Sequence, residues 1–261
     1  MKRGCTQCGE CLNVCPVYAL YKREEYAPKG KRLLLEAIDP EYGGSPDSPM
    51  PWDDIRELAR LCAGCERCQR ACARKLSTCD LLAEARSRNP HWTQALWDVW
   101  IRRVGPLWPM AGKIAMLAPD AVIPGALRSS VDTARALVDL PPCEPWVKLR
   151  PAQKVNGTKV ALFSGCTAKN ARPRWIAKAH ELLEGWGYEL LDTSDFACCG
   201  GTLHHAGQLG ALAEVRERNL ELWRSLGKPY VASFCASCKH SLEGYTAVLS
   251  PEEGKEWKQK C

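Results

Sequence analysis

The sequence has no uninterrupted apolar run of about eighteen residues, the length that a membrane-spanning helix needs. Its most apolar stretch, residues 104–127, is broken by Lys113, Asp120 and four prolines. The first residues, MKRGCTQCGEC, lack the apolar segment of a secretory signal. We therefore expect no transmembrane segment and no export, and place the chain in the reducing cytoplasm.

The sequence also lacks the marks of a nucleic-acid-binding protein and of a disordered one. Lys and Arg number 36 against 30 Asp and Glu, a formal net charge of +6, but they are scattered rather than gathered into a stripe. Apolar residues make up 46% and charged residues 25% of the 261 positions, enough for folded cores. We expect folded domains and no nucleic-acid partner.

Cysteine is the residue in excess, with 16 in the chain. In a reducing compartment, cysteines bind metal or carry redox chemistry more often than they form disulfides. A 4Fe–4S core held by four thiolates carries about −2. Two such clusters would bring the net charge from +6 to about +2, so the basic excess is best interpreted as compensation for thiolates.

Two cysteine runs with the spacing C-x2-C-x2-C-x3-C lie in residues 1–90, and this is the ligand pattern of bacterial ferredoxins. In that pattern the fourth cysteine of each run binds the other cluster, although Ala73 replaces the proline expected after the second run. The predicted ligands are Cys5, Cys8, Cys11 and Cys72 for cluster 1, and Cys62, Cys65, Cys68 and Cys15 for cluster 2. Zinc is the alternative, but its sites usually use separated cysteine pairs.

The 46 residues between the two runs are too many for a compact ferredoxin. They include an expected turn at 41–51 and an expected helix at 52–61, where Leu58 and Leu61 lie at helical spacing. We therefore predict an α-helical ferredoxin domain over residues 1–90 with two 4Fe–4S cubanes.

Residues 91–150 are predicted to be a helical connector that ends in a proline-rich linker. Trp97, Trp100, Ile101 and Val104 fall on one face of an expected helix. We interpret this face as packing against a flanking domain. The alternative is a docking surface for a partner or for the membrane interface.

Residues 151–261 alternate strand and helix patterns. Strands are expected at 159–163, 188–191 and 230–234, with helices at 209–226 and from about Cys238. Such alternation indicates parallel strands and right-handed crossovers. The predicted fold class is α+α/β: an α-helical ferredoxin domain followed by a single α/β domain with a small parallel sheet.

Five further cysteines follow the expected strands, and the carboxyl ends of parallel strands share one sheet edge, where ligands bind. These cysteines are Cys166, Cys198, Cys199, Cys235 and Cys238. Five soft ligands exceed the needs of a tetrahedral zinc ion. Iron is therefore favoured, with zinc or redox-active thiols as alternatives.

The Cys198-Cys199-Gly200 arrangement resembles the cysteine-rich CCG domain of heterodisulfide reductases. The order of the two domains also resembles one subunit of anaerobic glycerol-3-phosphate dehydrogenase and the glycolate oxidase iron–sulfur subunit. The resemblance implies that the five cysteines hold a third 4Fe–4S cluster, which is non-cubane in the heterodisulfide reductases, where disulfide reduction takes place at it.

Many members of that family carry two facing CCG repeats, whereas this sequence ends soon after one. We therefore expect an electron-transfer subunit of a cytoplasm-facing complex, possessing no membrane span of its own and working with a flavoprotein, a cytochrome or a quinone-reactive membrane subunit. A catalytic thiol–disulfide reductase is the alternative, in which Cys198 and Cys199 react and His204 supplies a proton. A zinc-stabilised scaffold is the third hypothesis.

The remaining candidates have weaker patterns. His205 follows His204 and shares its possible role as a proton donor, although histidines in loops and helix caps are commonly structural. Lys169 and Lys239 lie just past cluster cysteines, where solvation is the default expectation for a lysine. Cys79, Cys143 and Cys261 fall outside every motif, and we interpret them as buried or incidental thiols.

Overall fold

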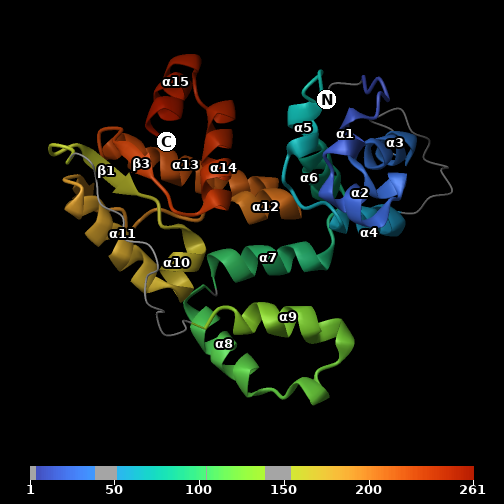
Figure 1. Cartoon of the computed structure of the whole chain (residues 1–261), viewed down its shortest axis with the longest axis horizontal. Coiled ribbons are helices and arrows are strands. Elements are labelled where there is room, and N and C mark those ends of the chain that lie inside the picture. Colours follow the sequence, from blue (N-terminus) through green and yellow to red (C-terminus); the bar gives the residue numbers. More distant parts are fainter. Residues whose placement is uncertain (1–3, 39–51, 104, 139–153) are drawn as a thin grey trace. The chain divides into compact units, whose positions relative to one another are not determined.

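The computed structural model describes residues 4–38, 52–103, 105–138 and 154–261 (Figure 1). The expected turn and proline-rich linker, with Cys143, lie outside these residues. The chain divides into two compact units, Met1–Trp97 with Thr202–Gly210, and Asp98–Gly201 with Ala211–Cys261. Within the described segments, none of the helices combines the length and apolarity needed to cross a bilayer.

The first unit is built from short helices, as an α-helical ferredoxin domain requires. They are α1 (Glu10–Asn13), α2 (Pro16–Tyr21), η1 (Glu24–Tyr26), α3 (Pro28–Ile38), α4 (Trp52–Arg60), α5 (Arg67–Ala71), α6 (Thr78–Arg88) and most of α12 (Gly201–Ala206). Leu35 of α3 packs with Leu81 and Leu82 of α6 in its core. The helix expected at 52–61 is confirmed as α4.

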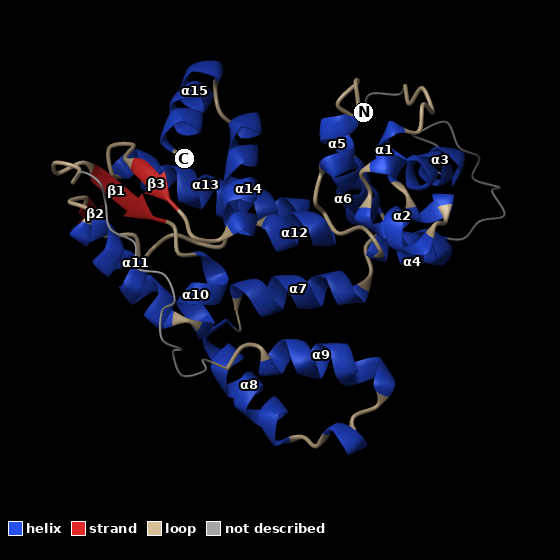
Figure 2. Cartoon of the chain, viewed as in Figure 1, coloured by secondary structure: helices blue, strands red, loops and turns tan. Residues whose placement is uncertain are grey.

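The second unit holds the sheet and the longer helices (Figure 2). Its elements are η3 (Gly105–Leu107), α8 (Trp108–Leu117), η4 (Asp120–Val122), α9 (Gly125–Arg135), β1 (Lys159–Leu162), α10 (Gly165–Ala171), α11 (Pro173–Gly185), β2 (Glu189–Leu191), α13 (Leu209–Ser225), β3 (Tyr230–Ala232), α14 (Ala236–Glu243), η5 (Gly244–Val248) and α15 (Pro251–Lys260). Helix α7 (Trp92–Arg102) runs across the boundary between the units.

The sheet has the strand order β2-β1-β3, and β1 pairs in parallel with both neighbours. The expected parallel pairing is confirmed, although β3 ends two residues before Phe234. Ala161 and Phe163 pack into a core with Trp223 of α13 and Trp257 of α15. Because side chains alternate along a strand, the buried Val160 and Leu162 face the opposite side.

The tryptophans after residue 91 divide between packing and exposure. The rings of Trp100 and Trp108 stack with centroids 5.5 Å apart, and Trp108 Nε1 donates to the Trp100 carbonyl at 3.1 Å. These two residues therefore serve packing, whereas Trp92 is exposed. The side chain of Trp97, and Val104 altogether, lie outside the described residues.

Candidate iron–sulfur sites

The two cysteine runs have matching backbones. Corresponding cysteines lie 57 positions apart, as Cys5 and Cys62 do. At the same separation, Gln7 (φ 57°) corresponds to Gly64 (φ 64°), and Gly9 (φ 84°) to Glu66 (φ 52°), all in the left-handed region. In each loop a left-handed residue, Gly9 or Glu66, directly precedes a short helix, and such a left-handed to right-handed step occurs in backbone nests that bind anions.

An open cavity in the first unit is lined by the four thiols assigned to cluster 2. Cys62, Cys65 and Cys68 of the second run line it together with Cys15, the last cysteine of the first run. This is the crossed combination that the sequence pattern predicted. Cys79 also lines the cavity, although no motif included it.

A buried positive charge lies at this cavity. The Lys31 side chain is only 4% exposed, and its Nζ donates to the Tyr26 carbonyl at 2.6 Å. Burial lowers the pKa of Lys31, while the sulfur atoms of Cys62 and Cys15 act to raise it. A buried ammonium is costly without a negative neighbour. The donor set of this cavity therefore fits an anionic iron–sulfur cluster.

Residues of the first turn of α6 form hydrogen bonds to two thiols of the second run. The Cys79 thiol hydrogen-bonds the sulfur of Cys62 and holds the pKa of Cys62 at about 6. Burial raises the pKa of Cys68, and hydrogen bonds from the Thr78 hydroxyl and N–H oppose that rise. Cys79 is therefore a buried thiol, as expected, but not an incidental one.

The cysteines assigned to cluster 1 are less enclosed. Burial raises the pKa of Cys11, and the sulfurs of Cys68 and Cys5 lie near enough to add to that rise. Cys8 is exposed, and Cys72 caps the carboxyl end of α5. The backbone N–H of Leu76 is the largest cause of the lowered pKa of Cys72.

Across the described residues, no three His, Cys, Asp or Glu side chains surround one point closely enough for a single metal ion. Cluster ligands bind different iron atoms at different corners, so their sulfur atoms need not converge on one point.

The five cysteines assigned to the third cluster form one connected group in the second unit. Cys166 lies in α10 after β1, and Cys235 caps α14 after β3. Side-chain hydrogen bonds join the sulfurs in the order Cys166, Cys198, Cys199, Cys238 and Cys235. The five sulfurs thus lie together, and Cys166 and Cys235 follow the carboxyl ends of β1 and β3.

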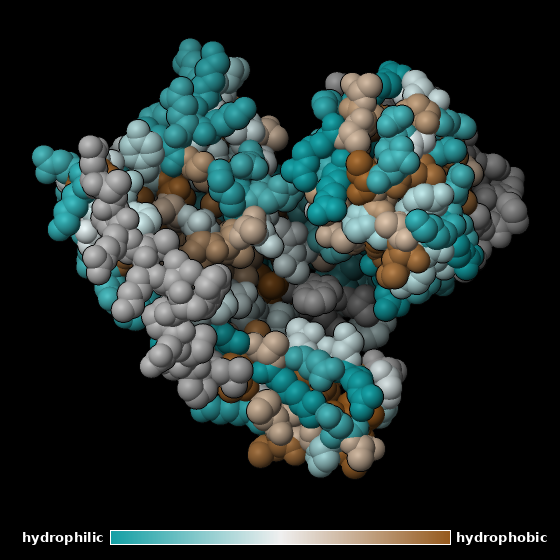
Figure 3. Space-filling view, in the orientation of Figure 1, coloured by the Kyte–Doolittle hydropathy of each residue, from teal (hydrophilic) through white to brown (hydrophobic). Residues whose placement is uncertain are grey.

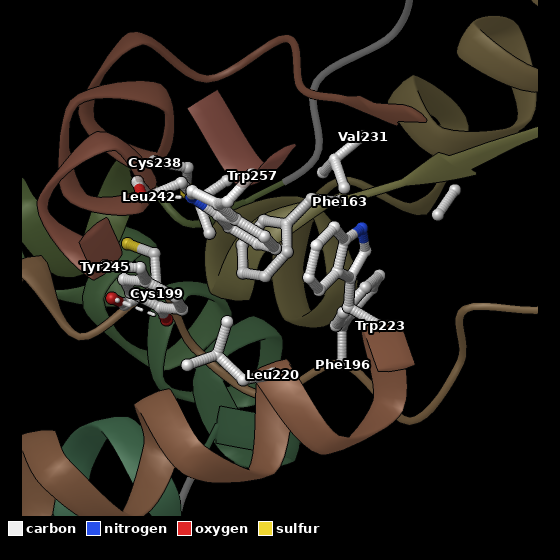
Figure 4. Packing of buried hydrophobic residues seen from close by; sticks show 11 residues of the cluster. Phe163, Phe196, Cys199, Leu220, Trp223, Val231, Cys238, Leu242, Tyr245 and Trp257 are labelled. Carbon is white, nitrogen blue, oxygen red and sulfur yellow. Dashed lines mark hydrogen bonds between the residues drawn. The ribbon is translucent and has the colours of Figure 1, made fainter. Parts of the chain in front are cut away.

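Cys199 is the centre of this group and is 5% exposed. The thiols of Cys198 and Cys238 hydrogen-bond its sulfur and lower its pKa to about 3. Figure 4 shows Cys199 beside Tyr245, with Cys238 nearer Leu242, at the edge of the aromatic core. The site therefore stabilises negative charge on sulfur even before iron is considered.

The cysteine loop is fixed by one buried amide that the sequence analysis missed. Asn219 on α13 is fully buried; its Oδ1 accepts from Ala197 N at 2.8 Å, and its Nδ2 donates to the Cys198 carbonyl at 3.1 Å and Tyr245 Oη at 2.9 Å. Tyr245 Oη in turn donates to the Cys199 carbonyl at 3.2 Å. The only sequence signal was a polar residue on the apolar stripe of an amphipathic helix.

The candidate proton donors and lysines have other partners. His204 Nε2 lies 3.1 Å from Asp80 Oδ1, and both residues belong to the first unit. Burial and the nearby Arg86 lower the pKa of His205 to about 4. The two lysines bind oxygen atoms: Lys169 Nζ donates to Ser194 O at 2.6 Å, and Lys239 Nζ to Glu243 Oε1 at 3.1 Å.

Comparison with known families finds a match for each of the two cysteine-rich regions of the sequence. Residues 2–76 match the family model described as a 4Fe-4S dicluster domain, and residues 160–243 match the one described as a cysteine-rich domain. The two matches define an iron–sulfur protein. The chain therefore contains a 4Fe-4S dicluster domain followed by a cysteine-rich domain, and it is similar to iron–sulfur and heterodisulfide reductase subunits.

Curated relatives align with nearly the whole chain. A probable glycolate oxidase iron-sulfur subunit of Bacillus subtilis is 23% identical over 99% of this chain and 62% of its own length. A dihydromethanophenazine:CoB–CoM heterodisulfide reductase subunit from Methanosarcina acetivorans is 25% identical over 90% of this chain and 55% of its own length. The chain thus spans little more than half the length of these relatives. No solved structure matches it significantly.

Proposed function

We propose that this chain is an electron-transfer subunit that carries three 4Fe–4S clusters. Two cubanes would be held by the crossed cysteine runs, and the third cluster by the five connected cysteines of the second unit. The grouping of those thiols carries the proposal. When bound, such clusters accept and pass on single electrons.

Crossed ligation supports a relay role for the first unit. Cys15 lies in one cavity with the second run, although 46 residues separate it from Cys62. A ligand shared in this way between two runs keeps the two clusters close to one another. Close clusters suit electron passage rather than binding of a substrate.

The third site fits an iron–sulfur cluster by the chemistry of its donors. Five sulfurs grouped on one sheet edge would need positive charge among them to bind together as thiolates, and bound iron would supply that charge. Asn219 and Tyr245 orient the loop through its carbonyls and leave the sulfurs free to bind. We assign Cys166, Cys198, Cys199, Cys235 and Cys238 as its ligands.

Disulfide reduction at this third site is the second candidate. Its support is the partial exposure of Cys166, Cys198 and Cys235, which leaves one side of the group open to a small disulfide. Under this proposal His204 has to leave Asp80 before it acts on a sulfur of the site, because the two are paired.

Partner subunits are part of the proposal because the relatives are named as subunits. Apolar side chains are exposed at helical spacing on α8 and on the residue before it: Leu107, Met110, Ile114 and Leu117. Figure 3 shows apolar surface in the region of α8 and α9. We propose that another redox subunit of a cytoplasm-facing complex, such as a flavoprotein, a cytochrome or a quinone-reactive membrane subunit, exchanges electrons with the chain.

Iron analysis of the anaerobically reconstituted protein tests the proposal. Three clusters require about twelve irons per chain, and a value of about eight or fewer would refute three-site binding. Oxidised protein is then incubated with candidate thiols. A new paramagnetic signal that Cys199→Ala abolishes and Cys261→Ala retains would favour disulfide reduction over the relay.

A further inference from the structure

The two halves of the ferredoxin unit match in their ligands but differ in what surrounds those ligands. Moving back 57 positions from Thr78 and Cys79 leads to Tyr21 and Lys22. Tyr21 is 48% exposed, and Lys22 caps the end of α2. Thr78 and Cys79 are instead buried and line the cluster 2 cavity. The two halves therefore share their cysteine pattern but differ in the residues that pack behind the cysteines.

The first turn of α6 gives hydrogen bonds to two sulfurs of that cavity. The Thr78 hydroxyl and N–H donate hydrogen bonds to the sulfur of Cys68, and the Cys79 thiol donates one to the sulfur of Cys62. The Cys79 sulfur accepts from the N–H of Glu66, one of the left-handed residues of the loop. Cys79 thus links the ligand loop to the helix.

Contacts away from the cavity hold this turn in place. Ser77 caps α6, because its Oγ accepts from Asp80 N at 3.0 Å. Arg32, which is 6% exposed, donates from Nη2 to the Ser77 carbonyl at 3.2 Å. The donors of Thr78 and Cys79 are therefore positioned by the fold, independently of what the cavity holds.

We propose that Thr78 and Cys79 tune cluster 2, raising its reduction potential while leaving cluster 1 unaffected. The inference rests on the proposed function, because it requires the cavity to hold a cluster. Reduction adds an electron to an already negative cluster, and hydrogen bonds to ligand sulfurs stabilise that added charge. Cys79 acts through the sulfur of Cys62 and is a positioning residue, not a ligand.

A redox titration followed by electron paramagnetic resonance tests this on the full reconstituted chain. In Cys79→Ala and Thr78→Val, we expect one cubane signal to titrate at a lower potential, with its reduction equilibrium weakened about tenfold, or about 59 mV for one electron. The other cubane keeps its potential. Cys79→Ser retains a donor and is expected to lie closer to the parent. Tyr21→Phe, at the position equivalent to Thr78, changes neither potential.

Three results are decisive. Parental potentials for both cubanes in Cys79→Ala and Thr78→Val, with parental iron content, would overturn the tuning role. Loss of about four irons in Cys79→Ala would also overturn it, because Cys79 would then be a ligand. If the parent chain itself binds no cubanes, the proposed function fails instead, and this outcome is visible before any variant is made.

Discussion

Replacing Asn219 should destabilise the second unit more than any other single amide change in its core. Its side chain satisfies Ala197 N, the Cys198 carbonyl and the Tyr245 hydroxyl. Asn219→Leu removes all three bonds at a site with no exposure. Each buried polar group left without a partner costs about 1–3 kcal/mol, and Tyr245 keeps its bond to Cys199. We therefore expect a loss of about 3–5 kcal/mol.

Denaturant unfolding of the metal-free protein, followed by tryptophan fluorescence, measures this loss. Trp223 and Trp257 of the same core report on the second unit. Glu221→Ala, an exposed change on the same helix, is the control and should stay within about 0.5 kcal/mol of the parent. If the free energy of unfolding of Asn219→Leu also stayed within about 0.5 kcal/mol of the parent, the hydrogen bonds from Asn219 would not stabilise the second unit.

Three further predictions concern charge, cluster separation and backbone shape. Arg224 and Lys228 hold the pKa of Glu253 at about 2, below its ordinary 4.5, so its stabilisation is present above pH 4.5 and is lost as the pH falls toward 2. Glu253→Gln should lower the free energy of unfolding by about 1 kcal/mol at pH 6 and flatten the acid limb of its plot against pH. An acid limb unchanged from the parent would contradict this prediction. Cys199→Ala should cost about four irons yet keep both cubane resonance signals, and their disappearance would disprove separate sites. Gly165→Ala should lower stability by about 1–2 kcal/mol in thermal melts, because Gly165 has φ +75° and an added Cβ would lie 2.8 Å from Cys238 Sγ; a parental melting curve would contradict this.

Most of the second unit's fold could be predicted because its signals are local. The apolar run at Lys159–Leu162 and the amphipathic pattern at 209–226 set strand and helix within about two residues. Alternation then required parallel strands, and parallel strands placed Cys166, Cys198 and Cys235 at one edge.

What the sequence did not reveal depends on contacts between distant residues. In the sequence, Asn219 cannot be told from any other polar residue of an amphipathic helix. Its role depends on a hydrogen bond to Tyr245, 26 positions later in the chain. Cys79 belongs to no spacing pattern, and only the burial of the α6 start brings it to Cys62. Glu66 adopts the left-handed backbone conformation although it is not glycine, the residue type that usually indicates this conformation in a sequence.

The nine residues Thr202–Gly210 interrupt one compact unit and complete the other. The Arg86 side chain donates to the His205 carbonyl, and Gly207 packs so closely on Ala83 and Ser87 that no side chain would fit there. A fragment ending at residue 97 would therefore expose a face of α6 that residues 202–210 cover. The segment that completes the first unit lies within the sequence of the second recognised domain, so transplanting the first unit into another protein requires residues 202–210 as well.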